Sequence, residues 1–336
     1  MDHPPPIHVI FVLLPDTLVL DWAGPAEALR MANRLMRAQD EPEPFVLHFA
    51  SPQAQTQGSV GITLANLQPL PQPLEAPSWV VLLGQVGARI NLDTDAVRQV
   101  LHWLQGLRLS PGRLELLTVC AGSVLAAAAG LLAGRRATTH HHHLDELRAA
   151  EPRCEVVANR VFVADGPVFS SAGVTTGIDL VLHRIAQVCG EVVAAQVAQT
   201  MAVALRRGPQ DPELSPLLDH RNHLHAALHR VQDAVSQQPR DPWTVPAMAQ
   251  VAHTSPRHLT RLFLEHAGIA PLQYLRRIRL HTAQAALAGG NNVTQAAELA
   301  GFSSDTQLRR TWRQFGLAGS PAREPRAPSA QSLQNS

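Results

Sequence analysis

The sequence contains no lysine, and its 28 basic residues other than histidine are all arginines. It also has only three cysteines, one tyrosine and 4% aromatic residues. Cys120, Cys154 and Cys189 are too few and too scattered for a disulfide framework or a zinc site. No apolar run is long enough to span a bilayer, and the first residues lack the basic and apolar segments of a signal peptide. We therefore expect a cytoplasmic protein that does not enter the membrane.

The charged residues are distributed unevenly along a chain whose formal net charge is only +1. Residues 240–336 contain 11 Arg and 5 acidic residues, a net charge of +6, whereas residues 1–239 contain 17 Arg and 22 acidic residues, a net charge of −5. A chain of 336 residues is long enough for two domains that each bury a core. The charge distribution predicts that only the C-terminal domain meets nucleic acid.

One pattern occurs twice between Trp243 and Phe315. Residues 248–263 align with residues 297–312 at a constant offset of 49 positions, and this alignment pairs Ser255 with Ser304. Each copy has helix-capping residues, a short break and a second helix with apolar residues at helical spacing, which is typical of a helix-turn-helix. Such a repeat indicates one structural unit used twice.

The second helix of each copy has an apolar side and a polar side. In the later copy Leu308, Trp312 and Phe315 recur at i, i+4 and i+7, so we expect Trp312 in the core rather than stacked on a base. The polar sides carry side chains that can reach phosphates and base edges. The predicted DNA-contacting residues are Arg257, His258, Thr260, Arg261, Thr306, Gln307, Arg309, Arg310 and Arg313.

Three strings in this region resemble the AraC/XylS family of bacterial transcription regulators. They are Ser255-Pro-Arg-His-Leu-Thr-Arg-Leu-Phe263, Gly268-Ile-Ala-Pro-Leu-Gln-Tyr274, and Ala300-Gly-Phe-Ser-Ser304 followed by Arg310-x-Trp-Arg313. The resemblance implies two recognition helices that enter successive major grooves, joined by a long helix from about Pro271 to Leu287. The family usually closes with Gly-x-x-Pro, an aromatic residue and Arg, and the longer segment from Gly316 to Pro321 departs from that pattern.

The residues before 208 alternate apolar runs of strand length with amphipathic stretches. Strands are predicted at 7–14, 45–50, 79–83 and 114–119. After a loop at 16–24, helices are predicted from Pro25, from the cap at 93–95, at 123–132 and at about 177–205, with a hairpin at 156–171. Strands that alternate with helices imply an α/β doubly wound parallel sheet.

Cys120 lies between the fourth predicted strand and the start of a small-residue helix, in the string Cys120-Ala121-Gly122. This arrangement is typical of a nucleophile elbow, in which backbone strain holds the side chain out and the following helix N-terminus favours a thiolate. It equally fits a small buried residue in a tight turn. The turn by itself leaves both interpretations open.

The residues around this turn resemble the PfpI/ThiJ family, a class I glutamine amidotransferase-like branch of the flavodoxin-like fold. The resemblance covers about Ile7 to Arg207 and rests on Val119-Cys-Ala-Gly122, Leu20-Asp-Trp-Ala-Gly-Pro25, Ala137-Thr-Thr-His140 and Ser171-Ala-Gly-Val-Thr-Thr-Gly-Ile-Asp179. Position by position, it implies a pocket in which the loop of Gly84 and the amide after the cysteine can bind an anionic oxygen. The pocket residues are Cys120, Asp21, His140, Gly84 and Ala121, and Gln85 replaces a second glycine that is usual beside Gly84.

A PfpI-like domain followed by AraC-type helices resembles the GlxA-type group of regulators. The resemblance implies a transcription activator that binds double-stranded DNA, senses a small metabolite in its N-terminal domain, forms a homodimer and works with RNA polymerase. Members of that group often govern the catabolism of amino acids and quaternary amines. We favour this interpretation over an enzyme, a cysteine hydrolase or isonitrile hydratase-like protein that uses Cys120. A regulator that responds to oxidation of this thiol is a third interpretation.

We expect a sensor domain at 1–208, a linker at 209–218, a DNA-binding domain at 219–320 and a disordered tail at 321–336. Leu224, Leu228, Val231 and Val235 predict a lead-in helix of the DNA-binding domain. The tract from His140 to His143 is interpreted as a solvated run, because four adjacent side chains are expected to point in different directions. Neither a cofactor nor a metal ion is expected.

Overall fold

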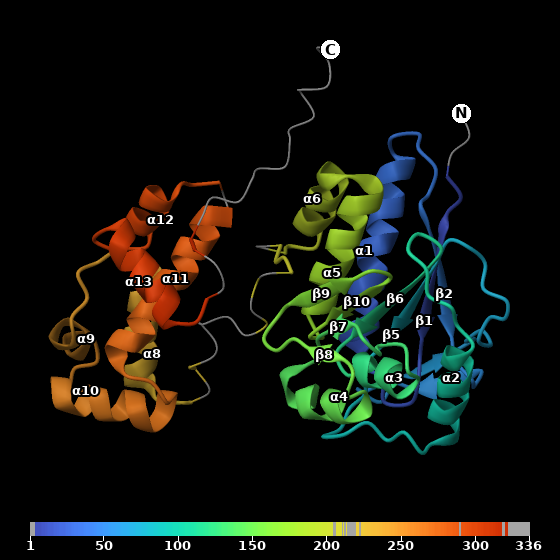
Figure 1. Cartoon of the computed structure of the whole chain (residues 1–336), viewed down its shortest axis with the longest axis horizontal. Coiled ribbons are helices and arrows are strands. Elements are labelled where there is room, and N and C mark those ends of the chain that lie inside the picture. Colours follow the sequence, from blue (N-terminus) through green and yellow to red (C-terminus); the bar gives the residue numbers. More distant parts are fainter. Residues whose placement is uncertain are drawn as a thin grey trace, which may run out of the picture. The chain divides into compact units, whose positions relative to one another are not determined.

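The computed structural model describes residues 4–203, 206–209, 211, 213, 220–221, 223–288, 290–317 and 320–321. The chain forms two compact units, residues 1–213 and residues 214–336 (Figure 1). Most of the predicted linker at 209–218 and nearly all of the predicted tail at 321–336 lie outside the described residues. In the described part of the chain, no helix is both long enough and apolar enough to cross a membrane.

The first unit is built on a six-stranded sheet in the order β2-β1-β5-β6-β10-β9. Its strands are β1 (Ile7–Val12), β2 (Phe45–Ala50), β5 (Ser78–Leu82), β6 (Leu114–Val119), β9 (Phe162–Asp165) and β10 (Val168–Ser171). All neighbouring strands are parallel except β9 and β10. The order of the parallel strands is that of the flavodoxin-like fold, in which the chain changes direction across the sheet between β1 and β5. The predicted doubly wound α/β fold is therefore confirmed.

Helices cover this sheet on both faces, because right-handed crossovers that run in opposite directions place their helices on opposite sides. They are α1 (Val19–Arg37), α2 (Asp95–Gln105), α3 (Gly122–Ala128), α4 (Leu144–Ala150), α5 (Thr176–Cys189) and α6 (Glu191–Thr200). α1 packs on α5 and α6, whereas α2 packs on α3. Every residue of β5 is consequently buried. Two small two-stranded sheets join β3 (Gln55–Gln57) to β4 (Thr63–Ala65) and β7 (Arg136–Ala137) to β8 (Glu155–Val156).

The loop predicted at 16–24 is wrong over most of its length, because α1 already begins at Val19. Pro25 lies inside this helix rather than at its start. A proline inside a helix removes one backbone hydrogen bond. A prediction from local sequence therefore starts the helix at Pro25 instead of passing the helix through it. Tertiary contacts outweigh that loss: the amide of Leu18 donates to the carbonyl oxygen of Gly84 at 3.0 Å, and Asp21 in the first turn is fully buried.

Three further boundaries differ from the prediction. The hairpin is shorter, with its turn at Gly166, because β8 at the predicted start pairs with β7 instead. The helix predicted at 123–132 ends at Ala128. The helical region predicted at about 177–205 is divided into α5 and α6 at Gly190, which has a φ of 89°.

In the second unit the described elements are all helical. They are α8 (Ala226–Gln237), α9 (Val245–Val251), α10 (Pro256–Leu262), the π-helical turn η2 (Phe263–Ala267), α11 (Pro271–Ala288), α12 (Val293–Leu299) and α13 (Asp305–Gln314). α9 with α10 and α12 with α13 form two helix-turn-helix motifs, and α11 is the long helix predicted to join them. The prediction of an all-α domain with two such motifs is confirmed.

This unit has two small hydrophobic cores rather than one. Tyr274 and Ile278 of α11 belong to the core of the first motif, and Ala283 and Leu287, further along the same helix, belong to the core of the second. The lead-in helix α8 buries Leu228, Val231 and Val235 completely in the first core. Leu224 was expected in the same stripe but is 100% exposed, because α8 begins only at Ala226.

Candidate DNA interface and sensor site

Each recognition helix begins after a serine whose side chain caps it. The hydroxyl oxygen accepts a hydrogen bond from the amide three residues later, at 3.3 Å for Ser255 and 3.2 Å for Ser304. The helices before them are capped by Thr244 and by a reciprocal capping box between Asn292 and Gln295. A cap is formed by residues within one helical turn. The repeated sequence therefore makes the helices of both motifs begin at equivalent positions.

The nine predicted DNA-contacting residues lie on α10 and α13, and seven of them are exposed. Thr260 and Gln307 are half-buried. The hydroxyl of Thr260 donates to the carbonyl oxygen of Pro256 at 2.9 Å, and the side-chain oxygen of Gln307 accepts a hydrogen bond from the amide of Ser303 at 2.7 Å. These two side chains therefore stabilise their own helices. The five arginines, His258 and Thr306 form the exposed part of the candidate interface.

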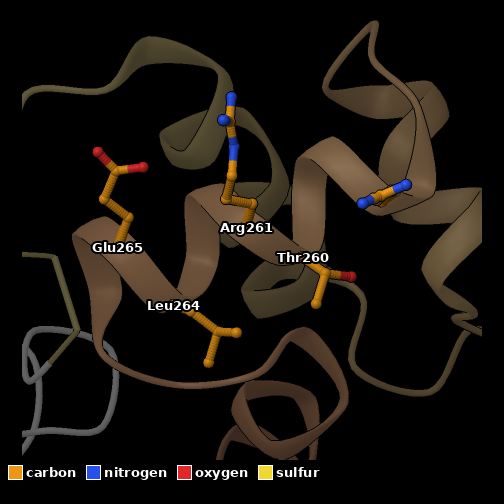
Figure 2. Close-up of a pocket in the computed structure, with 5 residues that line it drawn as sticks. Thr260, Arg261, Leu264 and Glu265 are labelled. Atoms are coloured by element: carbon orange, nitrogen blue, oxygen red, sulfur yellow. The ribbon is translucent and has the colours of Figure 1, made fainter.

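The first recognition helix continues through η2 to Gly268, where its apolar spacing predicts that it ends. Figure 2 shows a shallow pocket on its outer face, lined by Arg257, Thr260, Arg261, Leu264 and Glu265. Leu264 is 55% exposed, and an exposed apolar side chain beside arginines is suited to the methyl group of thymine. The sequence-based list omits Leu264 and Glu265. Leu264 follows Thr260 by four residues, so it lies on the same face of the helix, and this spacing could have added the leucine to the predicted interface.

The second motif is fixed to the segment that precedes the first. Gly301 in its turn has a φ of 77°, and a Cβ atom there would lie 2.7 Å from the Cα atom of Arg240 and 2.9 Å from the carbonyl oxygen of Pro239. Arg279 of α11 donates to the carbonyl oxygens of Pro239 and Asp241, both at 2.8 Å. The segment at 239–241, which precedes the first motif, therefore contacts both the turn of the second motif and the long helix α11.

The core side of the second recognition helix matches its prediction. Leu308 is fully buried, and Trp312 is 9% exposed. Phe315 is partly buried against the same core, and the guanidinium of Arg277 lies 5.7 Å from the centre of its ring. The prediction that Trp312 belongs to the core rather than to the interface is confirmed.

Cys120 has the strained backbone of a nucleophile elbow, with a φ of 56° between β6 and α3. Its amide donates to the carbonyl oxygen of Ser171 at 3.1 Å, and its own carbonyl oxygen accepts a hydrogen bond from the hydroxyl of Thr139 at 2.8 Å. Two glycines lie against the side chain, since a Cβ atom at Gly84 or Gly173 would lie 2.7 Å or 2.3 Å from the Cβ atom of Cys120. The neighbouring loops therefore hold the strained turn in place.

Asp21 approaches this cysteine from α1 and is fully buried. Its carboxylate accepts hydrogen bonds from the amides of Gly84 at 3.2 Å and Val174 at 2.8 Å. Burial raises the pKa of Asp21 to about 6, although these hydrogen bonds act in the opposite direction. Burial and the nearby Asp21 raise the pKa of Cys120 to about 12. The thiol is protonated at neutral pH, so the thiolate favoured by the elbow pattern does not form.

One of the amides expected to bind an anionic oxygen already has a partner, because the amide of Gly84 donates to the carboxylate of Asp21. The side-chain amide of Gln85 donates to the carbonyl oxygen of Pro15 at 2.7 Å. The structure thus brings Cys120, Asp21, Gly84 and Ala121 together as a closed, hydrogen-bonded cluster.

His140, the fifth predicted pocket residue, turns toward its own tract. Its ring centre lies 4.1 Å from that of His141 and 5.0 Å from that of His142, and its Nδ1 accepts a hydrogen bond from the amide of His142 at 3.4 Å. Among the described residues, no hydrogen bond joins His140 to Cys120. A general base must be within hydrogen-bonding reach of its proton, and the cysteine has no such histidine here.

The rings of the histidine tract lie together, contrary to the expectation that they point in different directions. The one-turn helix η1 (His141–His143) follows directly on His140 and folds the tract back on itself. One ligand atom from each of His140, His141 and His142 lies within 4.8 Å of the others. These three residues could hold a metal ion.

The chain after α6 is held on the first unit by contacts that the sequence does not reveal. Arg207 forms an ion pair with Asp179 at 2.6 Å, and the carbonyl oxygen of Asp211 accepts a backbone hydrogen bond at 3.0 Å. Glu213 accepts a hydrogen bond from Nδ1 of His141 at 2.8 Å. Partners so far apart in the sequence leave no local pattern. The start of the interdomain segment therefore lies beside the histidine tract.

Comparison with known proteins finds a family match in each of the two units. The DJ-1/PfpI family matches residues 96–187, and a helix-turn-helix domain matches residues 248–318. The HTH-type transcriptional regulator GbdR of Pseudomonas aeruginosa is 27% identical over 325 residues, which cover 96% of this chain and 84% of GbdR. The HTH-type transcriptional regulator CdhR of the same species is 28% identical and covers 94% of this chain and 90% of CdhR.

A third relative matches about half of the chain. The HTH-type transcriptional regulator GlxA of Rhizobium meliloti is 30% identical over 155 residues, which cover 46% of this chain and 48% of GlxA. The two family matches fall on the two units of the structure, one on the parallel sheet and the other on the paired helix-turn-helix motifs. The chain therefore joins a domain that matches the DJ-1/PfpI family to a helix-turn-helix domain, the arrangement expected of a DNA-binding transcription regulator, and it is similar to HTH-type transcriptional regulators over most of its length.

Proposed function

We propose that the protein is a transcription activator that binds operator DNA through α10 and α13 and a small metabolite through its N-terminal domain. The observation that carries this proposal is the pair of serine-capped recognition helices with exposed arginines, joined by α11. A helix of 18 residues is about 27 Å long, and successive turns of the major groove are about 34 Å apart. α11 is therefore of suitable length to hold two recognition helices in neighbouring grooves.

The nine predicted residues divide by chemistry into two sets of contacts. The arginines at 257, 261, 309, 310 and 313 suit phosphate oxygens and the O6 and N7 atoms of guanine. His258, Thr306 and the amide nitrogen of Gln307 suit base edges, and Thr260 suits a phosphate or a methyl group. The net positive charge of this part of the chain, against the net negative charge of the rest, agrees with the assignment, because phosphate contacts supply most of the affinity for DNA.

The metabolite site is proposed at the carboxyl ends of the parallel strands, around Cys120 and Asp21. Open α/β sheets bind ligands at this edge, next to the point where the strand order reverses. An amino acid or a quaternary amine is the proposed effector class, following the GlxA-type resemblance. The same resemblance is the basis for proposing a homodimer and a contact with RNA polymerase.

An enzymatic role has one observation in its favour, the positive φ of the cysteine elbow. The raised pKa of Cys120 and its lack of a histidine partner favour a binding role instead. Replacement of Cys120 by Ser separates the two roles. In a binding protein, the variant keeps DNA binding and changes only the thermal shift produced by amino acids or quaternary amines. Loss of a measurable turnover of any of these compounds would instead support the enzyme.

The DNA interface is tested by selecting bound duplexes from a random pool with the full chain and then measuring affinity at several salt concentrations. Arg261→Ala and Arg310→Ala are each expected to weaken specific binding by about 1–3 kcal/mol. A lost phosphate contact also reduces the slope of log affinity against log salt concentration by about 1. Arg98→Ala, which removes an exposed arginine of the first unit, is the matched control. Unchanged affinity and salt dependence in both interface variants would reject the assignment.

A further inference from the structure

The histidine tract beside the elbow has the donor atoms and the supporting contacts of a metal centre. Its ring centres are 4.1 Å apart for His140 and His141, 4.2 Å apart for His141 and His142, and 5.0 Å apart for His140 and His142. Of the residues that the structure describes, these are the three whose potential ligand atoms come within 4.8 Å of one another. Three imidazole nitrogens suit zinc, copper, nickel or iron rather than calcium or magnesium.

Glu213 supplies a second, independent observation. Its side chain is only 6% exposed, and its Oε1 accepts hydrogen bonds from both the amide and Nδ1 of His141, at 3.2 Å and 2.8 Å. Its Oε2 is buried without a hydrogen-bond partner. A carboxylate only accepts hydrogen bonds, so His141 carries its proton on Nδ1 and has its lone pair on Nε2. A histidine held by a carboxylate in this way is the usual arrangement at protein metal sites.

The neighbouring His143 is oriented in the same manner. Its Nδ1 lies 2.7 Å from Oε2 of Glu146, and Oε1 of that residue accepts a hydrogen bond from the amide of Ile90 at 2.8 Å. This pair fixes the last residue of η1 to a separate loop. The turn that gathers the three rings is therefore held at its far end, while the rings themselves remain partly or fully exposed to an entering ion.

We propose that His140, His141 and His142 bind a divalent transition-metal ion of the zinc type, with Glu213 orienting His141. Zinc–nitrogen bonds of about 2.0–2.1 Å place tetrahedral ligands roughly 3.4 Å apart, so the rings need only a small rotation to close on an ion. The fourth position is left for water or an exogenous ligand.

The position of this site gives it a structural consequence. Thr139, next to the tract, donates to the carbonyl oxygen of Cys120, and Glu213 is the last residue of the first unit. A bound ion therefore links the elbow loop to the beginning of the interdomain segment. This assignment does not depend on the proposed effector or on DNA binding, because metal binding is measured directly.

The test uses the full chain without an added polyhistidine tag. Zinc bound after dialysis is measured by elemental analysis, and Co²⁺ titration gives the affinity and the absorption bands of a tetrahedral site. The wild type is expected to bind one ion per chain. His142→Asn, at an exposed position that does not endanger folding, is expected to weaken binding at least about 100-fold, and Glu213→Gln about 10- to 100-fold.

Two controls separate this site from incidental binding by other histidines. His102→Asn removes an exposed histidine of α2 and should leave binding unchanged. His229→Asn disrupts the pair of His223 and His229 in the second unit, whose ring centres are 4.6 Å apart, and should also have no effect. If His229→Asn removes the bound ion, or if His142→Asn binds as tightly as the wild type, the proposal is overturned.

Discussion

The cysteine elbow of the first unit and the recognition helices of the second use polar side chains in opposite ways. At the elbow, Cys120 is 3% exposed and Asp21 is fully buried, and their hydrogen-bonding partners come from the surrounding loops. On α10 and α13 the arginines remain in water. Burial changes the chemistry of a group by disfavouring its charged form, whereas exposure leaves its charge available to a partner. The first arrangement suits a shielded site for a small molecule, and the second suits a polyanion.

The two units also differ in how their cores are divided. The first unit has one continuous core on both faces of its sheet, whereas the described residues of the second form two small cores, and α11 contributes side chains to both. A residue at the centre of the first unit is therefore constrained by several loops at once. A residue at a helix end in the second unit is constrained mainly by its own turn. The difference leads to unequal effects of the same substitution in the two units.

The largest expected difference is between Gly173→Ala and Gly268→Ala, since both glycines have positive φ values, 94° and 66°. At Gly173 the new Cβ atom would lie 2.6 Å from the Cα atom of Cys120, whereas nothing lies within 4 Å at Gly268. We expect a loss of unfolding free energy above about 4 kcal/mol for the first and about 1 kcal/mol for the second. Chemical denaturation followed by circular dichroism measures both. Equal losses would mean that the elbow is not the more constrained region.

The next effect concerns the reactivity of the buried thiol. With its pKa raised to about 12, Cys120 should react with an alkylating reagent at pH 8 at least about 1000-fold more slowly than a free cysteine, which has a pKa near 8.5. Cys189 is the internal comparison: burial raises its pKa only to about 11, so it should react about tenfold faster than Cys120, and unfolding should make all three cysteines reactive. Mass spectrometry of the digested protein gives the rates. Rapid labelling of Cys120 in the folded chain would restore regulation by thiol oxidation as an explanation.

The smallest of these effects is the pH dependence due to Asp21. Its pKa is 3.8 when unfolded and about 6 when folded, so folding takes up a proton between these values. The free energy of unfolding should therefore decrease by about 2 kcal/mol as pH rises from 4.5 to 7, and this contribution should be constant above that range. Unfolding measured at pH 4.5 and 7 in the wild type and in Asp21→Asn isolates the effect. An identical pH dependence in the two proteins would show that Asp21 does not titrate in this way.

Local sequence signals predicted the second unit well. Ser255 and Asn292 cap their helices as local signals predict, and Ser304, which the repeat aligns with Ser255, also caps its helix, because a helix start depends on residues within one turn. The same local reasoning failed at Pro25, where contacts of the first helical turn with a distant loop outweigh the missing hydrogen bond. It also placed Leu224 in a helix that begins two residues later.

The candidate sites show the same division. The exposed arginines could be predicted from the alternation of apolar and polar positions along each recognition helix. At the elbow, the sequence brought together Cys120, Asp21 and Gly84 through a family resemblance, and the structure places them in contact. The state of these groups could not be predicted, because it depends on how deeply neighbouring loops bury them. Glu213 could not be predicted as a partner of His141, because the two lie 72 positions apart.

The sequence by itself determined the two domain types, the repeated helix-turn-helix, the basic C-terminal third and the positions of most strands and helices. Each of these follows from patterns that extend over a few turns or a single strand. Only the tertiary structure decided that the cysteine is a protonated, closed elbow, that α1 passes through a proline, and that three adjacent histidines converge beside a buried glutamate. These properties depend on burial and on contacts between distant segments, which no local pattern of residues contains.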